Sequence, residues 1–131
     1  MLARTIVLWT IAACMSATPV AAQDRAPATM AFDGTYVGVS RTFEGKADAG
    51  APTRNCVPNG QPGPLTIAGG VARYSTLRAG TWEGSVNAQG VLVMHGRSGE
   101  RIDAQIDGRG TVTGRPTSGC SYDMVWQKEG K

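Results

Sequence analysis

The chain has 131 residues, of which 18 are glycine, and every glycine lies after residue 33. Beyond the first 22 residues leucine occurs only at Leu65, Leu77 and Leu92. This balance disfavours a helical bundle and most α/β enzymes, and it favours one domain of short strands joined by tight turns. The formal net charge is +3 with scattered cations, and because nucleic-acid binding needs a basic patch, we expect no nucleic-acid partner.

Residues 1–22 have the pattern of a cleavable export signal. Arg4 precedes an apolar stretch, and small residues at the end of the segment favour cleavage before Gln23. The apolar run is shorter than the roughly 20 residues that a membrane span requires. We therefore predict a periplasmic or secreted bacterial protein with a flexible leader over residues 23–31 and a single domain over residues 32–131.

A second interpretation of the N-terminal segment stays open. Residues 11–14 resemble a bacterial lipobox, in which Cys14 would be acylated and become the new N-terminus. Acylation would anchor the protein to a membrane, whereas ordinary cleavage would remove Cys14. Soluble export is the preferred prediction, because the signal in front of Cys14 would be unusually short.

Ordinary cleavage leaves two cysteines, Cys56 and Cys120. An even number of cysteines in an exported domain predicts a disulfide. A disulfide between Cys56 and Cys120 would close the long stretch of chain between them, and in the chain-entropy treatment it would stabilise the fold by up to about 4 kcal/mol. Neither cysteine has a second one nearby, and the chain has one histidine. The sequence therefore predicts no zinc, iron–sulfur or redox-active cysteine site.

From residue 32 onward, apolar and polar residues alternate with period two between turn signals. Thr35–Phe43 is the first predicted strand, and an irregular, proline-bearing loop over Glu44–Gly63 follows it. A disulfide at Cys56 would hold this loop down. The loop is the longest predicted connection between strands.

Hairpins with glycine-bearing turns follow the long loop. Gly69-Gly70 forms a two-residue turn, and the segments 86–92 and 106–112 share one turn design in which a glycine closes the bend. The predicted strands are Leu65–Ala68, Val71–Thr76, Thr81–Val86, Val91–His95, one through Ile106, one through Val112, and Cys120–Lys128. In this register Asp103 lies opposite Arg115 as an exposed pair, and Glu83 lies opposite His95.

Eight short strands in up-and-down order predict an all-β antiparallel meander that closes into a small barrel, because closure removes both exposed edges. Short strands and several inward aromatic rings predict a filled interior rather than a cavity. The predicted inward residues are Tyr36, Leu65, Ile67, Ala72, Tyr74, Trp82, Val86, Leu92, Met94, Ile102, Ala104, Ile106, Val112, Tyr122, Met124 and Trp126.

The Gly-Thr-Tyr opening at Gly34–Tyr36, the Thr-Trp-Glu-Gly motif at Thr81–Gly84 and the recurring turn glycines resemble small exported β-barrel proteins of bacterial envelopes. The overall plan is also similar to the avidin-type barrel and to the periplasmic metalloprotease-inhibitor barrel. The resemblance lies in strand number and hairpin order, and it includes no diagnostic binding motif. In the inhibitor barrels an N-terminal segment enters the protease cleft, a role that this resemblance would give to residues 23–31.

The sequence contains few residues in arrangements that are typical of enzyme active sites. His95 and Glu83 face one another on a predicted solvent face, where surface complementarity is the commoner reason for such a pair. Met94 and His95 are adjacent on a strand and therefore point to opposite faces, which argues against a copper site. No serine nucleophile motif or paired-carboxylate cleft accompanies them. We expect no enzyme activity, no cofactor and no bound metal.

The preferred functional hypothesis is a non-enzymatic envelope binding module of the protein-partner or inhibitor type. Its predicted binding surface is the long loop, with Arg54 and Asn55 as the contact residues and an envelope or extracellular protein as the partner. The first alternative is a carrier for a small apolar ligand, with Tyr36, Tyr74, Trp82 and Trp126 lining a pocket in the barrel mouth. The second alternative is a structural envelope component.

Overall fold

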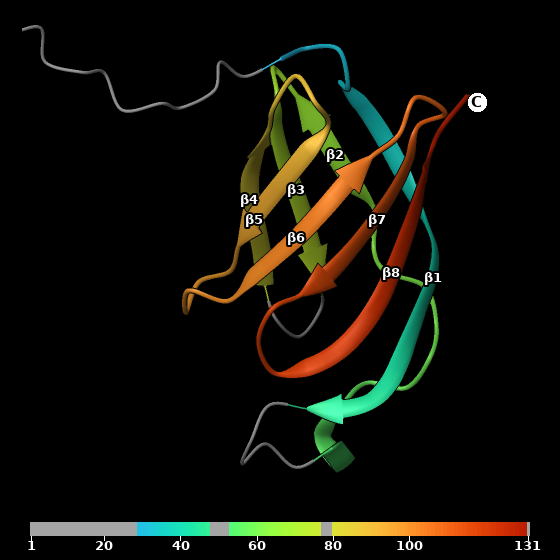
Figure 1. Cartoon of the computed structure of the whole chain (residues 1–131), viewed down its shortest axis with the longest axis vertical. Coiled ribbons are helices and arrows are strands. Elements are labelled where there is room, and N and C mark those ends of the chain that lie inside the picture. The colour runs from blue at the N-terminus through green and yellow to red at the C-terminus, as the bar shows by residue number, and fades with distance from the viewer. Residues whose placement is uncertain (1–28, 48–52, 77–79, 131) are drawn as a thin grey trace, which may run out of the picture.

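The structure, a computed structural model of the whole chain, describes residues 29–47, 53–76 and 80–130 (Figure 1). The predicted export signal, the acylation of Cys14 and most of the predicted leader lie outside the described residues. In the described part of the chain no helix is long and apolar enough to cross a membrane.

The described residues form a closed barrel of eight antiparallel strands in up-and-down order, so the predicted fold class is confirmed (Figure 1). Each strand pairs with its neighbours in sequence, and β1 pairs with β8 to close the barrel. The one described helix is a single 3₁₀ turn, η1 (Thr53–Asn55). The strands are β1 (Gly34–Ala47), β2 (Leu65–Ala68), β3 (Val71–Thr76), β4 (Gly80–Val86), β5 (Val91–His95), β6 (Arg101–Ile106), β7 (Thr111–Pro116) and β8 (Cys120–Lys128).

The two longer turns share one construction, as the sequence predicts. Asn87 Oδ1 accepts hydrogen bonds from the backbone N–H groups two and four residues ahead, at 3.0 and 2.9 Å. Asp107 Oδ1 does the same at 2.8 and 2.9 Å, and these bonds, that from Thr111 foremost, lower the pKa of Asp107. Gly90 and Gly110 close the two turns with φ of 77° each, a conformation that favours glycine.

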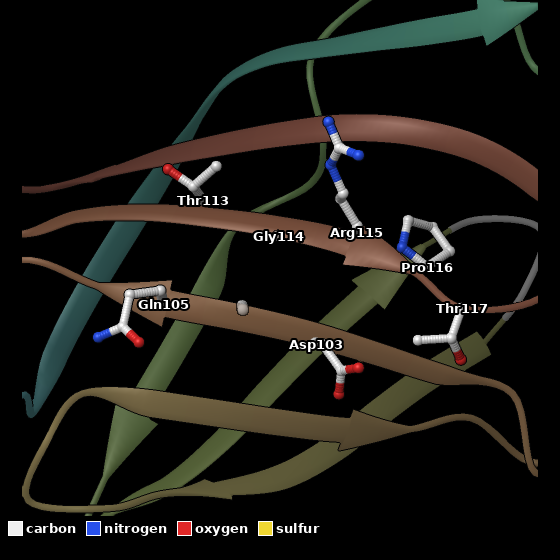
Figure 2. Close-up of a pocket in the computed structure, with 8 residues that line it drawn as sticks. Asp103, Gln105, Thr113, Gly114, Arg115, Pro116 and Thr117 are labelled. Carbon is white, nitrogen blue, oxygen red and sulfur yellow. The ribbon is translucent and has the colours of Figure 1, made fainter.

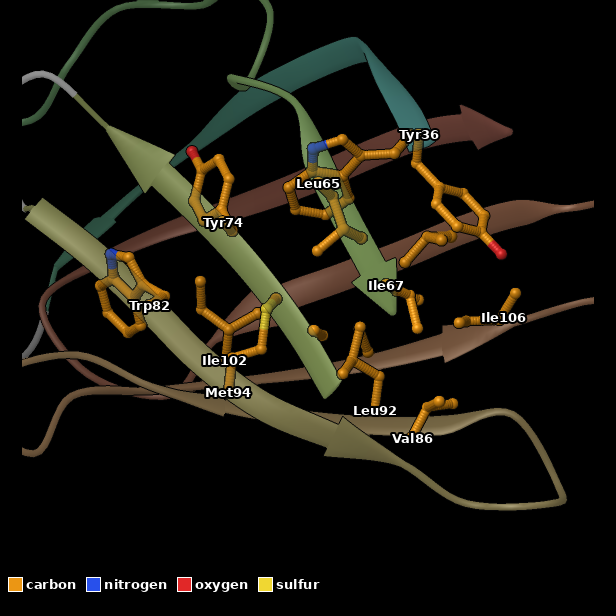
Figure 3. Close-up of a cluster of buried hydrophobic side chains, with 14 of the residues drawn as sticks. Tyr36, Leu65, Ile67, Tyr74, Trp82, Val86, Leu92, Met94, Ile102 and Ile106 are labelled. Atoms are coloured by element: carbon orange, nitrogen blue, oxygen red, sulfur yellow. The ribbon is translucent and has the colours of Figure 1, made fainter. Parts of the chain in front are cut away.

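The interior of the barrel is filled by fifteen buried hydrophobic residues (Figure 3). They are all of the predicted inward residues except Tyr122, which is partly buried and packs against the cluster. Close contacts across the core include the Tyr74 and Trp126 rings, whose centroids lie 5.4 Å apart in an edge-to-face arrangement. Packing of this kind stabilises the fold through apolar burial and ring geometry together.

The first strand is longer than predicted. The prediction ends it at Phe43, whereas β1 continues to Ala47 and pairs there with Cys120. The ladder with β8 shifts register twice, once beside Val39 and once between Phe43 and Ala47. Gly45, with φ of 73°, lies in the second irregular stretch. Such irregularities break the period-two pattern, and so the sequence-based prediction placed these residues in the loop.

The two ends of the barrel differ. One end, here called the turn end, carries the tight turns at 69–70, 87–90 and 107–110, and Phe32 packs there against the core. Tyr36 donates a 2.6 Å hydrogen bond to the carbonyl oxygen of Phe32, and the Asp33 carboxylate accepts from the Gly69 and Gly70 N–H groups at 2.7 and 3.0 Å. The opposite end carries the long connection.

Two alanine substitutions test the close packing of the barrel wall. A Cβ atom at Gly84 would overlap the backbone carbonyl of Val93, whereas a Cβ at Gly108 would meet nothing within 4 Å. We expect Gly84→Ala to lower the free energy of unfolding by about 3 kcal/mol or more and Gly108→Ala to change it by less than about 1 kcal/mol. Urea unfolding measures both, and equal effects of the two substitutions would contradict this packing.

Candidate functional site

The barrel end opposite the tight turns is the stronger candidate for a recognition surface. We call it the disulfide end, and its described connections are residues 53–64, 96–100 and 117–119. Binding residues are found disproportionately on loops that a rigid scaffold positions. The first of these connections is held to the barrel by a disulfide and by several hydrogen bonds.

A disulfide fixes the long connection to the last strand, as the sequence predicts. Cys56 follows η1 directly, Cys120 begins β8, and their Cα atoms lie 5.7 Å apart. A disulfide persists in oxidising compartments and is rare in the cytosol. The bond therefore indicates a compartment outside the cytoplasm.

Backbone hydrogen bonds join the same connection to β1. Arg41 and Gly60 exchange two of them, at 2.7 and 3.0 Å, as an isolated antiparallel bridge. Next to this bridge, Asn59 Oδ1 accepts a 2.7 Å hydrogen bond from the Phe43 N–H. The loop thus partly takes the place of a strand beside β1, which the sequence-based prediction of an irregular loop missed.

Three side chains of the barrel wall donate to backbone carbonyls of the connection. The Tyr122 hydroxyl donates to Val57 at 3.0 Å, and the Trp126 indole N–H donates to Gly63 at 2.8 Å. Arg41 Nη2 donates to Pro58 at 3.1 Å. The connection is therefore held at several points along its length and not only at the disulfide.

The two residues predicted to make binding contacts, Arg54 and Asn55, both lie in η1, immediately before Cys56. Arg54 is exposed to solvent. The disulfide therefore fixes the backbone that carries this side chain. Among the described residues, no ion pair involves Arg54.

The residues predicted to line an internal pocket do not gather around one space. Tyr36 lies at one end of the buried cluster and Trp82 at the other (Figure 3). Tyr36 hydrogen-bonds to Phe32 at the turn end, whereas Tyr74 and Trp82 face one another across β3 and β4. Trp126 fills the space beside Tyr74.

The larger of two described hollows lies outside the barrel wall, over β6 and β7 (Figure 2). It is open to solvent and has a volume of about 580 Å³. Beneath it, Ala104 and Gly114 pair across the strands, and these small residues let the wall approach the Trp126 ring. Sequence reasoning missed this hollow, although the predicted register already placed the two small residues opposite one another. Its lining residues are Asp103, Ala104, Gln105, Thr113, Gly114, Arg115, Pro116 and Thr117.

The second hollow has a volume of about 80 Å³ and lies at the turn end, beside Phe32, Tyr36 and Lys128. Its size suits at most a few water-sized groups. Among the residues predicted to line a carrier pocket, Tyr36 is the one that borders it.

The predicted pairing of Asp103 with Arg115 is correct in register but wrong as an ion pair. Asp103 pairs with Arg101 on its own strand at 2.6 Å. Arg115 instead reaches the neighbouring strands and contacts Asp123 at 2.6 Å and Glu44 at 3.0 Å. The extension of β1 to Ala47 places Glu44 within reach, which the shorter predicted strand could not show.

The predicted surface pair of His95 and Glu83 is present as register neighbours on β5 and β4. Both side chains are exposed, and the Glu83 carboxylate makes its ion pair with Arg73 at 3.3 Å. Among the described residues, no group of three or more histidine, cysteine, aspartate or glutamate side chains could hold a metal ion.

Comparison with known proteins gives no relative from which a function could be transferred. No family model, curated protein or solved structure matches the chain.

Burial of two tyrosines makes stability depend on pH in the alkaline range. Desolvation raises the pKa of Tyr74 above its usual value of 10.0, partly offset by the nearby Arg41 charge and by a backbone hydrogen bond from Gly63. Desolvation also raises the pKa of Tyr36, with the Asp33 charge as a smaller cause. The unfolded chain therefore loses these protons first as the pH rises, and stability falls from about pH 10 upward.

Substitution of Tyr74 tests this dependence. We expect Tyr74→Phe to flatten the decline of the melting temperature between about pH 9 and pH 11, because the substitution removes one of the two shifted groups. Thermal unfolding followed by circular dichroism measures the decline in each protein. A decline as steep in Tyr74→Phe as in the wild type would contradict the assignment.

Proposed function

We propose that this protein is a non-enzymatic, periplasmic or secreted binding module that recognises a protein partner of the bacterial envelope or its surroundings through the disulfide end. The main support for this proposal is that the long connection is attached to the barrel at several points. The disulfide, a backbone bridge and three side-chain donors hold a segment whose η1 residue Arg54 remains exposed.

Fastening of this kind favours binding because it removes conformational freedom before the partner arrives. A loop that becomes ordered only when it binds loses conformational entropy, and this cost reduces the net binding free energy. A connection that is already ordered avoids most of this cost. The same attachments also stabilise the barrel, so the order of the connection supports the proposal together with the exposure of Arg54.

The packed interior supports recognition on the outer surface over the carrier alternative. Pockets for small organic ligands generally enclose about 300 Å³ or more among apolar side chains. Here the apolar side chains fill the barrel, and the larger described hollow is an open groove with polar and charged side chains on its rim. A carrier would have to displace part of the core.

The exposed positions of His95 and Glu83 support a non-enzymatic role. Efficient general acid–base pairs are commonly desolvated and oriented by a third group. In the described part of the chain His95 has no hydrogen-bond partner that would orient its ring, and Glu83 is engaged with Arg73.

Loss of the η1 contacts should weaken partner capture without unfolding the barrel. The mature protein, immobilised as bait, would be exposed to periplasmic and culture-medium fractions of the source cells, and bound proteins identified by mass spectrometry. For a captured partner, we expect the double substitution Arg54→Ala and Asn55→Ala to reduce the affinity at least about tenfold.

The matched control changes two exposed residues of the turn end, Gln89→Ala and Arg109→Ala. This control should bind the partner as the wild type does, and all three proteins should melt at similar temperatures. Equal capture by the η1 variant and the wild type would contradict the site. Equal losses in the η1 variant and the turn-end control would contradict recognition through the disulfide end.

A further inference from the structure

The long connection contains an asparagine that is followed directly by a glycine, at Asn59 and Gly60. Asparagine is one of the thermolabile residues of proteins, because the backbone nitrogen of the next residue can attack its side-chain amide. Glycine has no Cβ atom, so a glycine at this next position lets the nitrogen approach most closely. The chain has two other asparagines, Asn55 and Asn87, and these precede a cysteine and an alanine.

Loss of the Asn59 amide needs only water and hydroxide, and both reach the pair because Asn59 and Gly60 are exposed to solvent. Hydroxide takes the proton of the Gly60 backbone N–H, and this nitrogen forms a bond to Asn59 Cγ. The bond between Cγ and Nδ2 then breaks, and Nδ2 leaves as ammonia with a proton from water. The product is a five-membered succinimide ring. Water opens this ring at either of its carbonyl carbons, which gives aspartate or isoaspartate at position 59.

The backbone bridge to β1 opposes the first of these steps. The connection runs alongside β1 (Figure 1), where the Gly60 N–H donates to the Arg41 carbonyl at 3.0 Å and the Gly60 carbonyl accepts from the Arg41 N–H at 2.7 Å. The Gly60 proton therefore points toward β1 and is held there. Attack on Asn59 Cγ requires the nitrogen to give up this hydrogen bond, so the bridge must open first.

The side chain of Asn59 is held by the same strand. Its Oδ1 atom accepts a 2.7 Å hydrogen bond from the Phe43 N–H, which fixes the amide group that the Gly60 nitrogen would attack. Ring closure requires rotation about the bonds of Asn59, and β1 restrains both reacting groups. A reaction that needs such a local opening proceeds in proportion to the population of the open state.

Attachments on both sides of the pair oppose this opening. The disulfide of Cys56 lies before the pair, and the hydrogen bond from Trp126 to Gly63 lies after it. They hold the two ends of the segment beside β1. Loss of the disulfide would therefore raise the population in which the bridge is open.

We propose that Asn59 is a site of spontaneous deamidation and that the bridge between Arg41 and Gly60 sets its rate. In the isoaspartate product the backbone runs through the former side chain, which adds one backbone carbon before Gly60. This carbon displaces Gly60 from its register with Arg41, so the bridge does not re-form. The modification therefore loosens the long connection irreversibly. It does not depend on the proposed recognition of a protein partner.

Peptide mapping by mass spectrometry tests the site on the mature, oxidised protein. A native sample and a sample unfolded in guanidinium chloride would be incubated at the same mildly alkaline pH, with the disulfide intact in both. We expect Asn59 to be converted at least about tenfold more slowly in the native sample, because its bridge is closed most of the time. Asn87 is the matched control, and it should remain asparagine in both samples over this period.

Amide hydrogen exchange at Gly60 measures the opening of the bridge independently. Exchange and deamidation both need the Gly60 N–H to leave the Arg41 carbonyl. Folding should therefore slow deamidation at least as much as it slows exchange at Gly60. In the variant Cys56→Ser with Cys120→Ser, we expect conversion of Asn59 to be at least about tenfold faster than in the native wild type. The comparison of native with unfolded wild type keeps the test decisive if this variant does not fold.

Four results would overturn the proposal. Equal conversion of Asn59 in the native and unfolded wild type would show that the bridge does not set the rate. Equal conversion of Asn59 and Asn87 in the unfolded chain would show that the glycine does not create a site. Slowing of deamidation by less than the slowing of Gly60 exchange would show that the reaction bypasses the bridge. Faster Gly60 exchange in the cysteine variant without faster conversion of Asn59 would separate the two events.

Discussion

The antiparallel pairing of β1 with β8 joins the two ends of the meander and closes the barrel, so that an eight-stranded sheet has no free edge to protect. The ladder extends from Tyr36 and Lys128 to Ala47 and Cys120. Because β1 and β8 continue past the shorter strands, they carry the long connection and its disulfide to one end of the barrel. The pairing of β1 with β8 therefore both closes the barrel and positions the candidate site.

Closure also fills the interior of the barrel, which supports our proposal that a partner binds on the outer surface. Inward side chains from eight strands fill the space between them, and two large rings, Tyr74 and Trp126, pack edge to face within it. At the turn end Phe32 packs against the core, and Asp33 accepts two backbone hydrogen bonds. We therefore propose the disulfide end, which carries the long connection, as the recognition surface.

Period-two alternation and glycine turns were sufficient to predict the strands, their hairpin registers and almost the whole core, because these depend on local patterns. Tyr122 is the exception, since it lies near the rim and uses its hydroxyl to hold Val57. The disulfide anchor of the long connection was predicted, but the donors Arg41, Tyr122 and Trp126 could not be, because their acceptors are backbone carbonyls and any residue type supplies those. The continuation of β1 beyond Phe43 was also hidden, since Gly45 and the register shifts interrupt the alternation.

We propose that the disulfide holds an ordered recognition loop on a barrel that closes without it. Amide hydrogen exchange can be followed residue by residue by NMR in the oxidised protein and in the variant Cys56→Ser with Cys120→Ser. We expect protection of the Gly60 amide in the oxidised protein, its loss in the variant, and retained protection along the β1–β8 ladder in both. An unprotected Gly60 amide in the oxidised protein, or collapse of the β1–β8 protection in the variant, would contradict it.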